Sequence, residues 1–242
     1  MRMMNLQARI GSALKSKQWK GLGPLLKEIG FADRKRALIT LQSLHQQKEL
    51  KRALPRLLSL CAESPDPDRA LDGFESVASA PGSVLSSLLP DERALGILVT
   101  AFALSPYFTT LLVRDPQILR WLFCEGGINT HREEADHRAA LQAFAEPIQD
   151  LGDLWSKLRR FKQREILRIG LRDLGGTAPF PEVAQELSDL ASACLELAYR
   201  YCYTTLCAEY GRPPVPDARQ GVEPCGFVVL GMGLLVVNHL QA

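Results

Sequence analysis

The apolar residues of this 242-residue chain recur at helical intervals almost without interruption as far as residue 211. Within residues 33–61, for example, Leu38, Leu41 and Leu44 follow one another at three-residue steps. Such spacing places apolar side chains on one face of a helix, whereas a half-buried strand needs alternation at every second residue. The regularity therefore predicts a mainly α fold, in which a multi-helix leader occupies most of the chain.

Short polar residues and prolines mark the expected starts of these helices. The expected N-caps are Asp33, Asp68 before a helix from Arg69, Ser105 before Pro106, and Asp115 before Pro116. Aspartate and serine side chains accept hydrogen bonds from the amides of a first turn, and proline fits the first helical position. Thr130 and Glu133 have the spacing of a capping box, which predicts a further helix start after Thr130.

Residues 157–174, with the sequence KLRRFKQREILRIGLRDL, form the most informative predicted helix. One of its faces carries Leu158, Phe161, Ile166 and Ile169, and another carries Leu167, Leu171 and Leu174. A helix with two apolar faces is expected to lie between neighbouring elements. Seven Lys and Arg residues run between the faces, and pairing with Glu165 together with snorkelling explains them better than a phosphate clamp.

The helical pattern continues through one more long segment and ends at residue 211. A long helix is expected between Pro181 and Gly211, and a Pro-rich linker follows it at 212–225. Residues 227–230, FVVL, predict a buried strand that leads into a turn with Gly231 and Gly233. The expected organisation is a basic N-terminal segment at 1–32, an all-helical domain at 33–211, the linker, and the truncated start of an α/β domain at 226–242.

Charge is distributed unevenly along the chain. Residues 1–60 hold 13 Lys or Arg against 3 Asp or Glu, although the formal net charge of the whole chain is only +2. A basic surface can bind nucleic acid, but this part lacks the interleaved aromatic residues of a nucleic-acid-binding surface. Solvated helices are the favoured interpretation, and no nucleic-acid partner is expected.

Other compositional features point to the cytoplasm. The six cysteines are irregularly spaced and include no C-x-x-C pair, which is typical of reduced thiols and not of zinc ligands. The longest apolar run, 226–237, is shorter than the roughly 18 residues that a membrane span needs, so no membrane partner is expected. The first thirty residues lack the continuous apolar core of a secretory signal, while their resemblance to an Arg-rich transit peptide is the less favoured alternative.

Two groups of residues have metal-binding side chains without a convincing metal-binding pattern. The D-x-D sequence at 66–68 has a proline between its carboxylates and follows no strand. The other group comprises His131, Glu133, Glu134, Asp136 and His137. On a helix the two imidazoles of that group would point about 120° apart, so an exposed charged turn is the favoured interpretation. The sequence therefore predicts no metal site and no catalytic residue.

The Gly231–Gly233 turn fits neither of the common nucleotide-binding motifs. A dinucleotide fingerprint needs a third glycine where this chain has Val236, followed by an acidic residue about 20 positions further on. A P-loop needs a lysine and a hydroxyl residue, and both are missing.

Four stretches together resemble one family. They are SPYFTTLLVRDPQILRWL, LRRFKQREILRIGLRDLGG, ELSDLASACLELAYRYCYTTLCAEYGRP and GFVVLGMG, in this order. Over residues 33–233 the chain resembles the start of the adenylyl-removing half of the bifunctional glutamine-synthetase adenylyltransferases, enzymes of bacterial nitrogen control. The resemblance implies a nucleotidyltransferase fold after the helices, with glutamine synthetase and a PII-type regulatory protein as partners.

The resemblance also implies a site that this chain carries only in part. The family's Gly-Met-Gly turn, here Gly231 and Gly233, is implied to bind the phosphates of ATP or free phosphate. The family continues with Lys-Leu-Gly-Gly and an Asp-x-Asp pair that holds Mg²⁺, but residues 234–237 of this chain read LLVV and no carboxylate follows. We therefore expect an N-terminal fragment without activity of its own. The alternative is a non-catalytic helical module that binds glutamine synthetase or a regulator.

The residues after Gly233 are expected to result from a frameshift. The family pattern has two glycines where this chain has Val236 and Val237, and Gly codons of the form GGT yield Val when they are read one base late. A selected strand and turn is the alternative. The apolar segment 226–237 is expected to promote aggregation.

Overall fold

The computed structural model describes residues 2–15 and 19–212. Every regular element within these residues is a helix, so the prediction of a mainly α fold is confirmed for the part of the chain that the structure describes. The predicted strand at 227–230 and the turn at Gly231 and Gly233 lie outside the described residues, and the start of an α/β domain there stays a prediction.

The described helices fall into two compact units. Among the described residues, unit 1 comprises those up to 130 together with 170–177, and unit 2 comprises 131–169 together with 178–212. The helices of unit 1 are α1 (Arg2–Lys15), α2 (Leu22–Ile29), α3 (Arg34–Gln46), α4 (Lys48–Glu63), α5 (Pro67–Ala78), α6 (Leu85–Leu88), α7 (Glu92–Leu104), α8 (Pro106–Arg114) and α9 (Gln117–Leu119). Three short elements, η1 (Trp19–Gly21), the π-helix η2 (Arg120–Cys124) and η3 (Gly127–Asn129), join them.

The core of unit 1 forms where α5 packs on α7. Helix α7 has an apolar sequence, ERALGILVTAFAL, and eight of its residues are buried. Gly73 of α5 allows the two helices to approach closely, because a Cβ atom at this position would lie 2.7 Å from Phe102 Cβ and 3.1 Å from Thr109 Oγ1. A side chain of any size at residue 73 would therefore push α5 away from α7.

The helix starts agree in part with the predicted caps. The Asp33 carboxylate accepts the Arg36 amide and the Ser105 hydroxyl accepts the Phe108 amide, as expected. The prediction for Asp68 is wrong: Asp66 caps α5, because Pro67 occupies the first helical position. The prediction for Asp115 is also wrong, since this residue ends α8 and α9 begins only at Gln117.

Asp68 instead joins two helices. Its carboxylate accepts the backbone amides of Ala32 at 2.7 Å and Asp33 at 3.0 Å, and so ties the first turn of α5 to the start of α3. This contact bridges 36 residues of sequence, which is why a local capping pattern did not reveal it.

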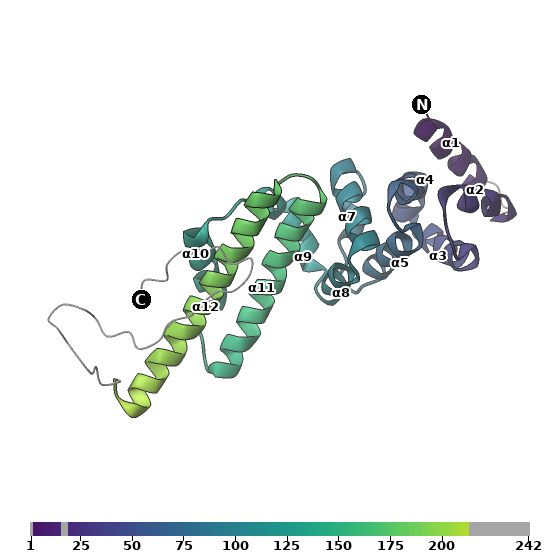
Figure 1. Ribbon diagram of the computed structural model, residues 1–242. Coiled ribbons are helices and arrows are strands. Elements are labelled where there is room, and N and C mark those ends of the chain that lie inside the picture. Colours follow the sequence, from purple (N-terminus) through teal and green to yellow (C-terminus); the bar gives the residue numbers. More distant parts are fainter. Residues whose placement is uncertain (1, 16–18, 213–242) are drawn as a thin grey trace. The chain divides into compact units, whose positions relative to one another are not determined.

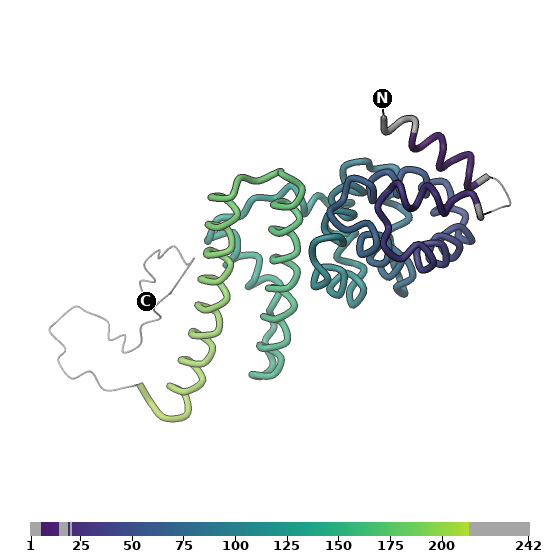
Figure 2. The backbone as a smooth tube through the Cα atoms, turned by 45° about the vertical axis from the view of Figure 1, so that its right-hand side comes forward, coloured from purple at the N-terminus to yellow at the C-terminus, as the bar shows by residue number. Residues whose placement is uncertain are grey.

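The described residues of unit 2 are built on three helices, α10 (Glu134–Ala145), α11 (Leu151–Leu174) and α12 (Phe180–Tyr210). The two long helices, α11 and α12, run side by side in opposite directions in both views (Figures 1 and 2). Their apolar residues form one core with α10, to which Leu141, Leu158, Phe161, Ile169 and Leu190 belong. The start of α12 lies within one residue of the expected Pro181, and Gly211 ends the helix with a φ of 80°.

The two predicted apolar faces of α11 are largely buried, with Ile166 and Leu174 half-buried. Leu158, Phe161 and Ile169 lie in the unit 2 core, and Leu167 and Leu171 on the other face have no exposed surface. The last turns of α11, from Gly170, group with unit 1.

No single helix of the described residues is long and apolar enough to cross a membrane. Helices α7 and α8 reach the required length and apolarity only as a pair, and the chain bends by 117° between them. Most of α7 is buried inside unit 1, which accounts for its apolar composition.

Candidate functional site

Unit 2 buries three charged side chains completely. Glu165 and Arg168 of α11 and Glu186 of α12 have no exposed surface. Arg168 Nε donates to Glu165 Oε2 at 2.8 Å, and Arg168 Nη2 donates to Glu186 Oε1 at 2.5 Å. Because removing a charge from water costs several kcal/mol unless it is paired, the helices hold these groups in one defined geometry.

The segment before α10 completes this buried ion network. The Arg132 backbone amide donates to Glu186 Oε1 at 3.0 Å, and the Arg132 guanidinium donates to Glu165 Oε1. Arg164 lies 3.5 Å from the same Glu165 oxygen and stacks over the Phe144 ring, 5.0 Å from its centroid. The network therefore joins three segments that are up to 54 residues apart in sequence.

The charges around Glu165 decide its protonation state. Burial on its own would raise the pKa of this carboxyl, but the positive charges of Arg168, Arg132 and Arg164 and the hydrogen bond from Arg168 outweigh that effect. The pKa of Glu165 therefore lies below its ordinary value, and the side chain is ionised at neutral pH.

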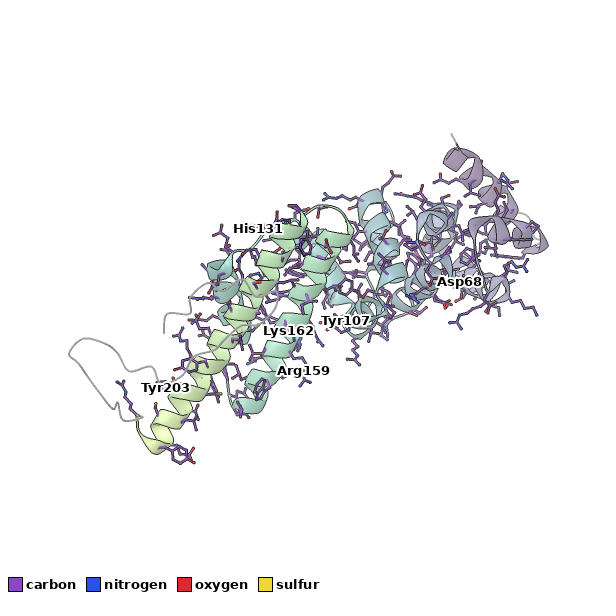
Figure 3. The ribbon with its side chains drawn as sticks, in the orientation of Figure 1. Asp68, Tyr107, His131, Arg159, Lys162 and Tyr203 are labelled. Carbon is purple, nitrogen blue, oxygen red and sulfur yellow. The ribbon has the colours of Figure 1, made fainter. Side chains whose placement is uncertain are left out.

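The network confirms one interpretation of the arginine-rich helix. Arg164 and Arg168 pair with Glu165, as expected from their spacing. Arg159 and Lys162, labelled on α11 in Figure 3, have exposed side chains. The inner arginines thus hold neighbouring helices together, and the outer basic residues face solvent.

His137 of α10 lies beside this network and is fully buried. Neither ring nitrogen has a hydrogen-bond partner among the described residues. Burial, reinforced by Arg168 and Arg132 and opposed by Glu165 and Asp136, lowers the pKa of His137 to about 4. The imidazole is therefore neutral at pH 7.

The expected exposed turn at 131–137 needs two corrections. His137 is inside the unit, where Glu165 and Arg168 of α11 and Arg132 act on its ring. The capping box also lies three residues later than predicted, since the Glu133 amide donates to Asp136 Oδ2 at 3.1 Å and α10 begins at Glu134. Thr130 instead donates its hydroxyl back to Gly126 O, at 3.5 Å.

His131 is half-exposed and lies at the start of α12 (Figure 3). Its Nδ1 atom is 3.2 Å from Glu182 Oε1, and Glu186 is close to both. The sequence pattern places His131 with His137 and the acidic residues of its own segment, and gives no indication of a contact with α12. The four-residue spacing of Glu182 and Glu186 was the one available signal.

The predicted phosphate-binding residues, Gly231 and Gly233, lie outside the described residues. The five cysteines of the described residues, Cys61, Cys124, Cys194, Cys202 and Cys207, are free thiols, and burial raises the pKa of Cys61 to about 12 and that of Cys194 to about 11. Buried, protonated thiols of this kind are poor nucleophiles.

The fold and the buried network define the class of this chain: a mainly helical protein whose described residues form two units, one of which is held by paired buried charges. The family of glutamate–ammonia ligase adenylyltransferases matches residues 95–237, a range that includes every member of the network. Since the match covers more than half of the chain, the chain belongs to this family.

Three relatives are each described as a bifunctional glutamine synthetase adenylyltransferase/adenylyl-removing enzyme. The one from Pseudomonas aeruginosa is 35% identical over 193 residues, which are 78% of this chain and 19% of the relative. That from Thioalkalivibrio sulfidiphilus is 33% identical over 177 residues, 73% of this chain and 17% of the relative. That from Pseudomonas putida is 33% identical over 139 residues, 57% of this chain and 14% of the relative. The chain spans less than a fifth of the length of these relatives.

Proposed function

We propose that this chain is the helical part of a bifunctional glutamine synthetase adenylyltransferase/adenylyl-removing enzyme, and that its helices support the catalytic segment without performing the chemistry. The observation that carries the proposal is the identity of 33–35% with enzymes of that name, over up to 78% of the chain. The buried ion network lies within the matched residues and fixes α10, α11 and α12 against one another.

The 242 residues by themselves are proposed to be inactive. Adenylyl transfer needs cations to neutralise the charge that develops on the transferred phosphoryl group, and paired carboxylates hold them. The residues after Gly233 contain no carboxylate. ATP and Mg²⁺ would therefore act through segments that these residues do not supply. Glutamine synthetase and a PII-type regulator are the proposed partners, and the cytoplasm is the proposed compartment.

A chimera tests the supporting role. Residues 33–211 of this chain would replace the corresponding residues of the Pseudomonas aeruginosa relative, and the removal of adenylyl groups from modified glutamine synthetase would be measured. We expect the chimera to keep activity and the isolated 242-residue chain to have none. A second chimera with Arg168→Met is expected to lose activity together with stability, whereas Arg159→Met, an exposed control, is expected to retain both.

Turnover by the isolated chain would contradict its proposed inactivity. A folded but inactive first chimera would contradict the supporting role.

A second candidate function, binding without catalysis, is favoured by the exposed apolar side chains of unit 2. Trp155 on α11 and Leu206 and Tyr210 on α12 are each more than half exposed. Leu206 and Tyr210 are four residues apart and share one face of α12, and exposed apolar patches are typical of binding surfaces. Retention of the isolated chain on immobilised glutamine synthetase, lost in a Trp155→Ser and Leu206→Ser double variant, would support this function.

A further inference from the structure

Three metal-binding side chains meet at the start of α12. One ligand atom from each of His131, Glu182 and Glu186 lies within 4.8 Å of the other two. Glu182 and Glu186 are four residues apart, and so share one face of the helix. His131, labelled in Figure 3, belongs to the segment before α10 and reaches the same place.

The carboxylate of Glu186 is held in a fixed orientation. Its Oε1 atom accepts the Arg132 amide at 3.0 Å and Arg168 Nη2 at 2.5 Å, and the side chain is fully buried. Groups that hydrogen-bond to a ligating carboxylate fix its orientation. The buried ion network therefore presents Glu186 as a rigid ligand, beside which the more exposed His131 and Glu182 can adjust.

Acidic side chains accumulate around this end of α12. Asp189 is almost fully buried, and its pKa is raised by burial and by the nearby charges of Glu134, Glu186 and Glu133, against a hydrogen bond from Gln185. Neighbouring carboxylates repel one another when they are ionised, and a bound cation would offset their negative charge.

We propose that His131, Glu182 and Glu186 bind one divalent first-row metal ion, such as Zn²⁺ or Mn²⁺, with water completing the coordination shell. Imidazole and carboxylate are ligands that both ions accept. Tetrahedral ligands at about 2.1 Å from a metal ion lie about 3.4 Å apart. The separation of 3.2 Å between His131 Nδ1 and Glu182 Oε1 already fits this arrangement. Separations up to the 4.8 Å limit need only a small side-chain rotation to close.

The site is independent of the chemistry proposed above, because none of its ligands belongs to the Gly231–Gly233 segment. Its role would be to join the segment before α10 to the first turns of α12. Metal binding would therefore stabilise unit 2.

Titration of the intact chain with Mn²⁺ tests the proposal, with the free ion followed by its electron paramagnetic resonance signal and Zn²⁺ added as a competitor. We expect one bound ion per chain. His131→Ala and Glu182→Gln are each expected to weaken binding at least tenfold. Both side chains are partly exposed, so the variants are expected to fold, which circular dichroism would check. His45→Asn and Glu63→Gln, which change the same residue types in unit 1, serve as controls and are expected to bind like the parent.

Two results would overturn the proposal: no binding by the intact chain, or equal binding by the parent and both site variants. His131 and Glu182 would then form an ion pair only. X-ray absorption of the Zn²⁺-loaded chain gives a check that needs no variant. Nitrogen and oxygen ligands with one imidazole are expected, whereas a sulfur ligand would assign the ion to a cysteine and overturn the site.

Discussion

The α5–α7 pair of unit 1 and the α10–α12 helices of unit 2 are held together by different interactions. The residues that α5 and α7 bury are all apolar or glycine. The helices of unit 2 bury Glu165, Arg168, Glu186 and His137 beside their apolar core. The first pair depends on close fit, and the second group depends on charge pairing as well.

The difference has a physical consequence for how each region responds to change. Apolar contacts are non-directional, so a core such as α5–α7 tolerates changes that keep its volume. A buried ion network allows no such freedom, because removal of one partner leaves the others buried and unpaired. Unit 2 is therefore expected to be the more sensitive to single substitutions.

The largest expected effect follows removal of the central cation. Arg168→Met leaves Glu165 and Glu186 buried without their shared partner, and should lower the free energy of unfolding by about 3–5 kcal/mol, measured by urea titration. Arg159→Met, at an exposed position of the same helix, should change it by less than about 0.5 kcal/mol. Adding Glu165→Gln and Glu186→Gln to Arg168→Met should recover part of the loss. Equal effects of the two Arg variants would contradict the role of the network.

Acid should also weaken unit 2 through His137. Its pKa is about 4 in the folded chain, against an ordinary value of 6.5 in the unfolded chain. Between these values the unfolded chain binds the proton and the folded chain does not, so stability is lost as pH falls from about 6.5 toward 4. The full loss is at most about 3 kcal/mol.

Urea titrations between pH 6.5 and pH 5 measure this loss before most carboxylates titrate. The His137→Phe variant should show a flatter pH profile than the parent. The same slope in both chains would assign the pH dependence to other groups.

A smaller effect is expected in unit 1 from crowding between α5 and α7. Gly73→Ala places a Cβ atom 2.7 Å from Phe102 Cβ, and should cost about 1–3 kcal/mol. Gly96→Ala in α7 is the matched control, because nothing lies within 4 Å of its added atom, and better helix propensity should stabilise it by up to about 1 kcal/mol. Thermal unfolding of both variants measures these changes in stability. If Gly73→Ala were as stable as the parent chain, the close approach of α5 and α7 would be refuted.

The smallest expected effect concerns the link between α3 and α5. Asp68→Ala removes the acceptor of the Ala32 and Asp33 amides, and should cost about 1 kcal/mol. Asp68→Asn keeps an acceptor oxygen and should cost less. If a urea titration gave Asp68→Ala the same free energy of unfolding as the parent chain, the link between α3 and α5 would not contribute to stability.

The parts of the fold that could be predicted from the sequence are those determined by local contacts. Helical periodicity indicated the two apolar faces of α11, and the caps at Asp33 and Ser105 bond to amides three residues away. Asp68 and His137 were misassigned because their surroundings come from segments far away in sequence. A pattern within ten residues contains no information about such partners.

The candidate site shows the same limit. Pairing of Glu165 with Arg168 was foreseeable, since the two residues are three positions apart on one helix. The contribution of Arg132 and Glu186, and the meeting of His131 with Glu182, depend on how α12 packs beside α10, which no local spacing reveals.

Native-state hydrogen exchange of the Arg168→Met chain tests the central claim of this comparison most directly, because one experiment reports on both regions. The amides of α10, α11 and α12 are expected to lose protection, while those of α5 and α7 exchange as in the parent chain. An equal loss of protection in α5 and α7, or unchanged protection in α12, would contradict the claim that buried charge pairing holds unit 2 and apolar fit holds unit 1.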